Sequence, residues 1–87
     1  MRARRVQVQD EVVRDGESVV LLGRQVIRLS ALGTTLLELC GDWRETEELA
    51  AGLVERFGEP PEGADARFMT EASLHALHDQ GLVDLEH

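Results

Sequence analysis

Histidine and cysteine are the side chains of this sequence that could hold a metal ion or act as a nucleophile. His75 and His78 are three residues apart in a predicted helix, so they would be neighbours on its surface and could fill two positions around zinc. No third ligand stands at a suitable spacing, and Cys40 has no activating neighbour in the sequence. The sequence also has no glycine-rich phosphate loop, G-x-S-x-G element or H-E-x-x-H pair. We therefore expect no catalytic residue, no metal site and no cofactor, and a protein that is not an enzyme.

The composition predicts one small acidic domain that spans residues 1–87. The chain has a formal net charge of -8, with 43% hydrophobic and 30% charged residues, and it is too short for two separate cores. Its 17 acidic residues against nine basic ones argue against nucleic acid as a partner, because such binding depends on Lys and Arg neutralising phosphates. An anionic membrane is disfavoured for the same reason. One cysteine, no signal peptide and no long apolar run predict a cytoplasmic protein.

The two ends of the sequence are expected to stay outside the core. Residues 1–5 include three arginines and are predicted to be flexible and solvated. Residues 85–87, Leu-Glu-His, resemble the start of an appended histidine tag, or else they are native.

Two turn sequences predict a meander of three antiparallel strands. Asp15-Gly16 separates two valine-rich runs and suits a type I′ turn, in which both central residues need a positive φ. Gly23-Arg24 suits a type II′ turn in the same way. The predicted strands lie near 6–14, 17–22 and 25–29, and the third would be at an edge of the sheet.

Capping residues and apolar spacing predict three helices after the strands. Ser30 is placed to cap the first helix, and Gly41 to end it in the left-handed conformation. Thr46 is the expected cap of the second helix, which Gly58 would end, and Gly81 would end the third. The predicted helices are 31–40, 46–57 and 62–80.

The order of these elements predicts an α+β fold, with a three-stranded antiparallel sheet followed by a three-helix winged helix-turn-helix. Cys40 and Leu82-Val83 would fill core positions, and Trp43 would be a hydrophobic plug between helices. A winged-helix DNA-binding regulator is disfavoured, because Arg67 is accompanied by four acidic residues in and before the third helix. An acyl carrier protein is disfavoured because Thr34-Thr35 stand where the carrier serine would be needed.

The predicted edge strand, 25–29, offers a function that needs no signature residue. An exposed edge presents unpaired N–H and C=O groups to any other extended chain. Strand addition takes its affinity from main-chain hydrogen bonds and its specificity from alternating side-chain pockets. We therefore expect this edge to bind another polypeptide.

The order of features from about Val12 to Val83 resembles the PqqD-like family, peptide chaperones that are also called RiPP precursor peptide recognition elements. The resemblance lies in hydrophobic residues and glycines: VVLL (19–22), IRLSALGTTLLEL (27–39), Gly41, TEELAAGLVERFG (46–58) and LHALHDQGLV (74–83). It implies a three-stranded sheet on a three-helix winged-helix core. It also implies binding of the leader segment of a ribosomally synthesised precursor peptide, and presentation of that peptide to a separate modifying enzyme, often a radical SAM enzyme.

By this resemblance, the leader adds as a strand to the third strand and lies between that strand and the third helix. The residues implied on the strand are Gln25, Val26, Ile27, Arg28 and Leu29. The residues expected on the helix are Arg67, Phe68, Glu71, His75 and His78. The opposite flank of the helix, with Met69 and Ser73, is the alternative wall. Arg24 and Arg28 could hold acidic positions of the leader, while the acidic domain as a whole would favour basic ones.

Two other functions remain open from the sequence. The same edge strand could dimerise the chain or dock it onto another protein, which would make it a structural or interaction domain. A DNA-binding regulator is the less favoured alternative.

Overall fold

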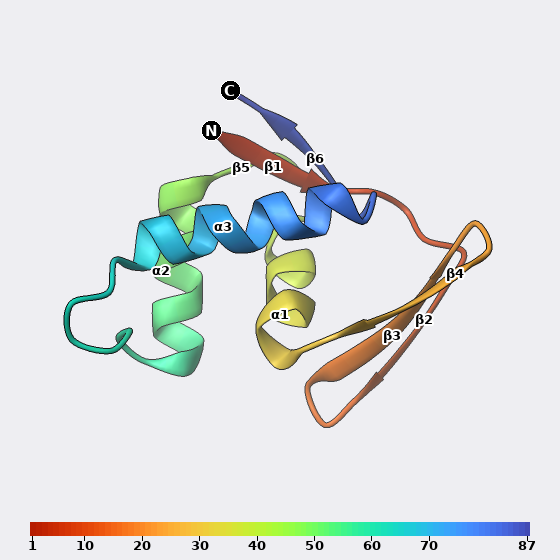
Figure 1. Ribbon diagram of the computed structural model, residues 1–87, viewed down its shortest axis with the longest axis horizontal. Helices are drawn as coiled ribbons and strands as arrows, with labels where there is room; N and C mark the ends of the chain where they lie inside the picture. Colours follow the sequence, from red (N-terminus) through yellow and green to blue (C-terminus); the bar gives the residue numbers. More distant parts are fainter.

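The computed structural model describes residues 1–87 and contains two three-stranded antiparallel sheets and three helices (Figure 1). The strands are β1 (Arg2–Arg5), β2 (Asp10–Arg14), β3 (Glu17–Leu22), β4 (Gln25–Leu29), β5 (Arg44–Glu45) and β6 (Val83–Glu86). The helices are α1 (Ala31–Leu39), α2 (Thr46–Phe57) and α3 (Ala66–Asp79). The α+β class, the first sheet and the three helices are confirmed, and the winged helix-turn-helix arrangement stays a prediction.

The first sheet, in the order β2-β3-β4, is the predicted meander. Asp15 and Gly16 have φ values of 55 and 80°, as a type I′ turn requires, and Gly23 has a φ of 61° in the second turn. β2 begins at Asp10 and not at residue 6, because the preceding segment turns away to the rest of the molecule, where the Val6 N–H donates to the Leu82 carbonyl at 2.8 Å.

The second sheet, in the order β5-β1-β6, was not predicted, and it corrects the expectation that residues 1–5 are flexible. β1 is its middle strand, and Ala3 at its centre has no exposed surface. Leu85 and Glu86 belong to β6 and pair with Ala3 and Arg2, so the two ends of the chain lie side by side (Figure 1). The short predicted tail at Leu82-Val83 does close over the core, since both residues are buried.

The boundaries of α1 and α3 show which capping predictions hold. Ser30 caps α1 as expected, with its hydroxyl accepting from the Gly33 N–H at 3.3 Å. Gly41 directly follows the C-cap, Cys40, but it does not adopt the predicted left-handed conformation. α3 begins at Ala66 and not at residue 62, because the Asp65 carboxylate caps it and accepts from the Arg67 N–H at 2.9 Å.

Thr46 has a different role from the predicted cap of α2. The N-cap is Glu45, without a side-chain hydrogen bond, and the Thr46 hydroxyl instead donates to the Met1 carbonyl at 2.9 Å. The Thr46 N–H donates to the same carbonyl, also at 2.9 Å. The N-terminal strand is thereby attached to the start of α2.

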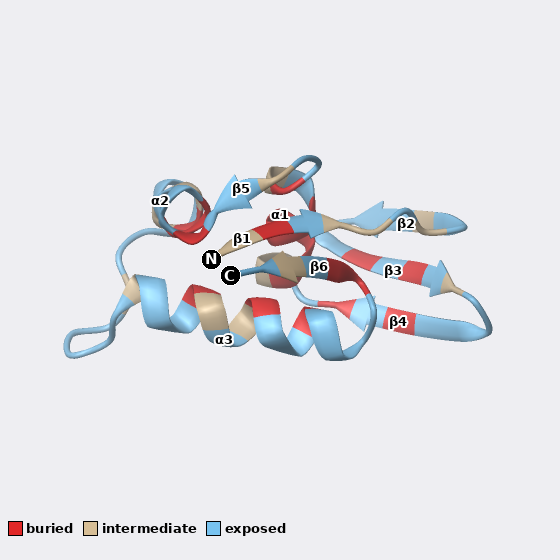
Figure 2. Cartoon of the chain, turned by 90° about the horizontal axis from the view of Figure 1, so that it is seen from above, coloured by how far each residue is buried: buried red, intermediate tan, exposed pale blue.

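The core lies where the three helices meet both sheets (Figure 2). Cys40 is fully buried there, as predicted, and burial raises the pKa of its thiol against a smaller lowering by the Arg5 guanidinium. Trp43 is not a plug: it is half-buried on the surface, with the guanidinium carbons of Arg2 and Arg4 at 5.4 and 4.7 Å from its ring centroid. None of the three helices combines the length and the apolar character that crossing a membrane requires.

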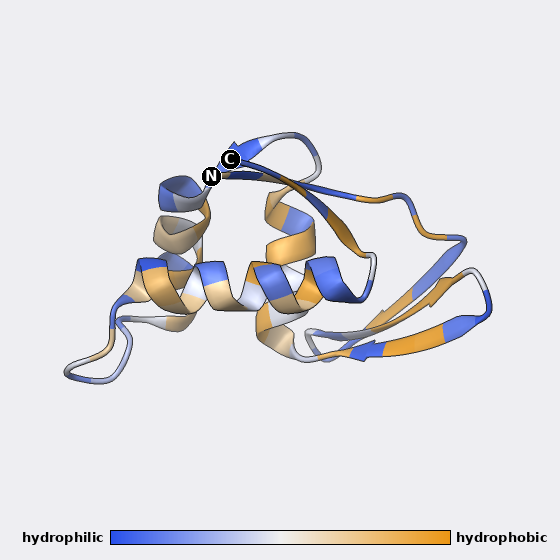
Figure 3. Cartoon of the chain, turned by 45° about the horizontal axis from the view of Figure 1, so that its top comes forward, coloured by the Kyte–Doolittle hydropathy of each residue, from blue (hydrophilic) through white to orange (hydrophobic).

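The outer face of the meander keeps several apolar side chains in contact with solvent. They belong to all three strands, which Figure 3 shows with long hydrophobic stretches in orange. The exposed residues are Val12, Val19, Leu21 and Val26. Their partners on the inner face, such as Val20 and Ile27, are buried, so the alternation expected for a one-sided sheet is present.

Candidate functional site

β4 is a free edge of the meander and the strand of that sheet that lies nearest to α3 (Figure 2). Its inner side chains Ile27 and Leu29 are both 7% exposed and belong to the core. Its outer side chains Val26 and Arg28 are exposed. The strand is therefore fixed by packing on one face while one of its hydrogen-bonding edges stays open.

The strand register determines which backbone groups point out of that edge. Leu22 and Gln25 flank the two-residue turn and are paired, so they exchange hydrogen bonds, and every second pair along the ladder does the same. On the other side of β3, the Gln9 N–H donates to the Leu21 carbonyl at 2.9 Å, which fits this alternation. Val26 and Arg28 therefore direct their N–H and C=O groups away from β3, toward any added strand.

A cleft of about 340 Å³ lies beside this edge, between the end of β4, the start of α1 and one flank of α3. Its apolar surface comes from Leu29, Leu32 and Leu77, together with an alanine of α3. The lining residues are Arg28, Leu29, Ser30, Leu32, Gly33, Ser73, Ala76, Leu77 and Gln80. Arg28 is the one charged residue among them, so the cleft combines an apolar wall with a cation.

Two hydrogen bonds fix the elements that form the cleft. The Ser30 cap stops β4 and starts α1, which turns the chain sharply at the end of the edge strand. The hydroxyls of Ser18 in β3 and Thr34 in α1 are 2.8 Å apart and both residues are buried, so this bond ties the sheet to α1. Leu77 of α3 then packs into the same core and lines the cleft.

The predicted residues of the strand and of the helix do not lie together. Gln25 to Leu29 form β4, as expected, but the α3 flank that faces it contains Ser73, Ala76, Leu77 and Gln80. Of the predicted helix residues Arg67, Phe68, Glu71, His75 and His78, none lines this cleft, and Phe68 lines the adjacent groove. Ser73, from the alternative flank with Met69, does line the cleft, and which flank contacts a peptide stays a prediction.

The five predicted helix residues have other surroundings. Arg67 forms ion pairs with Glu47 of α2 at 3.0 Å and with Glu71 at 3.3 Å. The ring of His75 stacks near that of His87, with centroids 6.3 Å apart, beyond the end of β6. His78 is exposed, and Phe68 is 70% exposed. The helical spacing of Thr70, Leu74 and Leu77 correctly predicts the face of α3 that packs in the core. It does not predict which of the two flanks beside that face lies next to β4.

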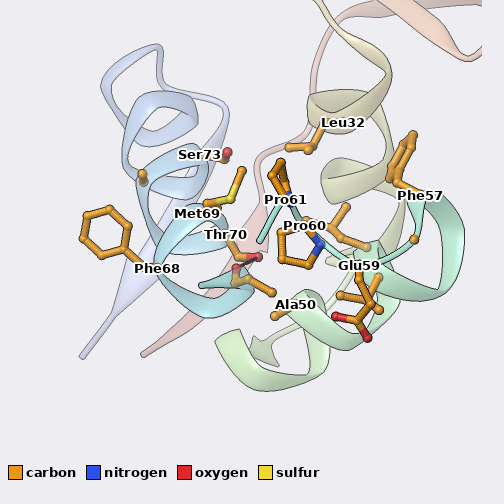
Figure 4. A pocket seen from close by; sticks show the side chains of 15 residues that line it. Leu32, Ala50, Phe57, Glu59, Pro60, Pro61, Phe68, Met69, Thr70 and Ser73 are labelled. Carbon is orange, nitrogen blue, oxygen red and sulfur yellow. Dashed lines mark hydrogen bonds between the residues drawn. The ribbon is translucent and has the colours of Figure 1, made fainter. Parts of the chain in front are cut away.

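An apolar groove of about 480 Å³ lies on the same flank of α3, between that helix and α2 (Figure 4). The prolines of the α2–α3 loop and Met69 extend toward its centre, whereas Phe68 points away from it (Figure 4). Its lining residues are Leu32, Ala50, Leu53, Val54, Phe57, Gly58, Glu59, Pro60, Pro61, Ala66, Phe68, Met69, Thr70, Ala72 and Ser73. Leu32 and Ser73 also line the cleft, so the two hollows are adjacent and share these two residues as a common wall.

Charge is distributed unevenly between the meander and the loop beside the groove. All nine basic residues are arginines, and six of them form ion pairs with carboxylates. The three that do not are Arg14, Arg24 and Arg28, and all three belong to the meander. The loop at the other end, 58–65, has three carboxylates and no basic residue. The β4 end is therefore cationic and the groove end is anionic.

Comparison with known proteins identifies the family of this chain. The family model described as Coenzyme PQQ synthesis protein D (PqqD) matches residues 17–83, which is more than half of the chain. The chain belongs to the PqqD family. Neither the comparison with curated proteins nor the comparison with solved structures found a match.

The PqqD match confirms the resemblance found in the sequence, and it covers the whole candidate site. It begins at the first residue of β3, Glu17, and ends at the first residue of β6, Val83. All residues that line the cleft and the groove fall within it, whereas β1 and β2 fall outside. Membership in the PqqD family indicates an accessory role in the biosynthesis of PQQ or of a related peptide-derived product.

Proposed function

We propose that this PqqD-family protein binds the leader segment of a ribosomally synthesised precursor peptide by strand addition to β4, and presents it to a separate modifying enzyme such as a radical SAM maturase. The open edge of β4 beside the cleft is the observation that supports this most directly. Val26 and Arg28 offer outward N–H and C=O groups there, and the apolar wall can take alternate side chains of the added strand.

The other edge of the meander, at β2, supports strand addition less well. The hollow beside the start of β2 is lined by seven residues, of which only Val8 is hydrophobic. A chain added along β2 would gain main-chain hydrogen bonds but few apolar pockets for its side chains, and such pockets give strand addition its specificity. Leu29, Leu32 and Leu77 supply an apolar wall of this kind beside β4.

The chemistry of the cleft suits binding and presentation. Arg28 is the only ionisable side chain that lines it, and a guanidinium stays protonated at neutral pH, so it can hold an anion but cannot serve as a general base. The Cys40 thiol is buried, and burial raises its pKa, which keeps it protonated and inert. The chemical step is thus assigned to the partner enzyme.

Amide NMR on the isotope-labelled protein tests this proposal, with the synthetic leader of the precursor peptide encoded beside the protein as the titrant. We expect chemical-shift changes at residues 25–33 and 73–80. We also expect slower amide hydrogen exchange at Val26 and Arg28 when the leader is bound, with no change at Ile27, whose N–H is already bonded to β3.

Two results would contradict the proposal. One is the absence of binding, or shift changes confined to α2. The other is protection of the Val26 and Arg28 amides in the protein alone, together with a dimer in sedimentation, because β4 would then be paired with a second copy of the chain.

A further inference from the structure

The groove between α2 and α3 begins where the β4 cleft ends. Leu32 of α1 and Ser73 of α3 line both hollows, so a chain that leaves the cleft has to pass only these two residues to reach the groove. The groove is also the larger of the two, at about 480 against 340 Å³. A peptide paired with β4 therefore has an apolar surface directly beyond its paired segment.

The walls of the groove expose large apolar side chains that nothing in the fold covers. Phe57 on α2 is 48% exposed and Met69 on α3 is 42% exposed. Pro60 and Pro61 of the loop that joins the two helices extend toward the centre of the groove (Figure 4). The size of the groove suits a bulky side chain such as Leu, Phe or Trp.

The charges around the two hollows favour a particular occupant. Glu59 lines the groove, and Glu62 and Asp65 follow it in the same loop, with no basic residue among them. The basic residues on either side of this loop already have partners, Arg56 with Glu38 at 3.5 Å and Arg67 with Glu47 at 3.0 Å. At the opposite end, Arg24 and Arg28 have no carboxylate partner. A peptide lying across both hollows would complement these charges if it had acidic residues near Arg28 and a basic residue near Glu59.

We propose that the peptide bound along β4 continues past Ser73 into the groove, inserts one bulky apolar side chain between α2 and α3, and places a basic residue beside the Glu59–Asp65 loop. This inference rests on the proposed function and extends it, since it names the residue types of the peptide beyond the paired segment. A helix of another protein fits the groove less well than this peptide does. Such a helix would contact Leu32 and Ser73 and would block the end of the cleft.

The test uses a random peptide library selected on the immobilised full chain. An enriched peptide whose binding is lost in Val26→Pro, which removes an outward N–H of β4, becomes the probe. The probe is then shortened from either end. On the wild-type protein, we expect loss of the end that contains an apolar residue and a basic one to weaken binding about tenfold, the gain expected from burying one large apolar side chain.

Variants of the groove separate this inference from the proposed function. Met69→Lys should weaken the full probe about tenfold and leave the shortened probe unchanged, because only the full probe reaches the groove. Ala51→Lys adds the same charge at an exposed site of α2 that lines neither hollow, and it should change neither affinity. The double variant Glu59→Lys/Glu62→Lys should remove the preference for a basic residue.

Three other results would contradict the groove inference, and one of them would also contradict the proposed function. If Met69→Lys weakens both probes equally or neither, the groove inference is overturned and strand addition to β4 stands. If no enriched peptide depends on Val26, the proposed function and the inference are both overturned. If the wild-type chain self-associates and Met69→Lys disperses it, a second copy occupies the groove and the inference is overturned.

Discussion

The sheet β2-β3-β4 and the sheet β5-β1-β6 each have three antiparallel strands, but they are assembled from different parts of the chain. The first joins consecutive segments through two-residue turns. The second pairs segments as far apart as Arg2 and Glu86, which are separated by 84 positions. The first sheet is therefore specified locally, whereas the second exists only once the helices have brought both ends of the chain together.

The two sheets also differ in what they leave available to a partner. In the second sheet, Arg2 and Arg4 pair with Glu86 and Asp84 and stack on Trp43, so its polar side chains are satisfied internally. In the first sheet, all three arginines lack carboxylate partners, and β4 keeps an open edge. The locally specified sheet thus keeps an open edge and unpaired cations, while the long-range sheet anchors the ends of the chain.

Breaking the second sheet should have the largest effect on stability. Ala3→Asp places a carboxylate at a position with no exposed surface, between β5 and β6. We expect the free energy of unfolding to fall by about 3 to 5 kcal/mol, the cost of an uncompensated buried charge. Urea denaturation followed by circular dichroism measures this. Ala64→Asp, on the exposed α2–α3 loop, is the control, and equal midpoints for the two variants would show that β1 is not anchored.

Proline scanning along β4 tests the assigned direction of its backbone groups. Ile27→Pro removes an N–H that bonds to β3, and we expect a loss of about 3 kcal/mol or more. Val26→Pro removes an outward N–H and should cost less than about 1 kcal/mol. Ile27→Ala is the control for loss of the isoleucine side chain. Thermal unfolding measures the change in the free energy of unfolding for all three variants. A greater loss for Val26→Pro than for Ile27→Pro would reverse the assignment of the open edge.

Hydroxyl deletions compare how each sheet is attached to its helix. Thr34→Val leaves the buried Ser18 hydroxyl without a partner and should cost about 1 to 3 kcal/mol. Thr46→Val should cost only about 1 kcal/mol, because the Met1 carbonyl keeps the Thr46 N–H as a donor. Adding Ser18→Ala to Thr34→Val should recover part of the loss. Denaturant titrations that gave additive losses for this pair would argue against the buried bond.

Removing a surface cation should have the smallest effect. Arg4→Gln loses the pairing with Asp84 and the stacking on Trp43, both at a partly exposed site, and should cost about 1 kcal/mol or less. Arg14→Gln, at an arginine without an ion-pair partner in the first sheet, should cost nothing measurable. Trp43 fluorescence in denaturant titrations reports both values. A larger loss for Arg14→Gln would show that the charges of the first sheet are already engaged.

Sequence reasoning succeeded where neighbouring residues determine the structure. Asp15-Gly16 and Gly23 adopt the positive φ values that their turns require, and Ser30 caps α1 as its position suggested. The sequence-based prediction was wrong where a side chain forms a hydrogen bond with a distant segment of the chain. Thr46 looked like a helix cap, but its hydroxyl binds Met1, which is 45 positions away. No local pattern distinguishes these two uses of a threonine.

The candidate site was half predictable for the same reason. β4 and its open edge follow from the two turns and from alternating burial, which are local features. The facing flank of α3 depends on how that helix crosses the sheet, and a helical wheel with core residues at Thr70, Leu74 and Leu77 permits either side. In the tertiary structure Ser73 lines the cleft beside β4, whereas Arg67 pairs with Glu47 of α2.

The sequence by itself determined the meander, the three helices and the family, because turn geometry, capping and apolar periodicity act over a few residues. It took the tertiary structure to show that Arg2–Arg5 form the middle strand of a second sheet, that Ser73, Ala76 and Gln80 line the cleft, and that the α2–α3 groove lies next to that cleft. These features come from packing between segments far apart in the chain. The local sequence pattern of a short strand or an exposed helix flank does not indicate which distant segment it contacts.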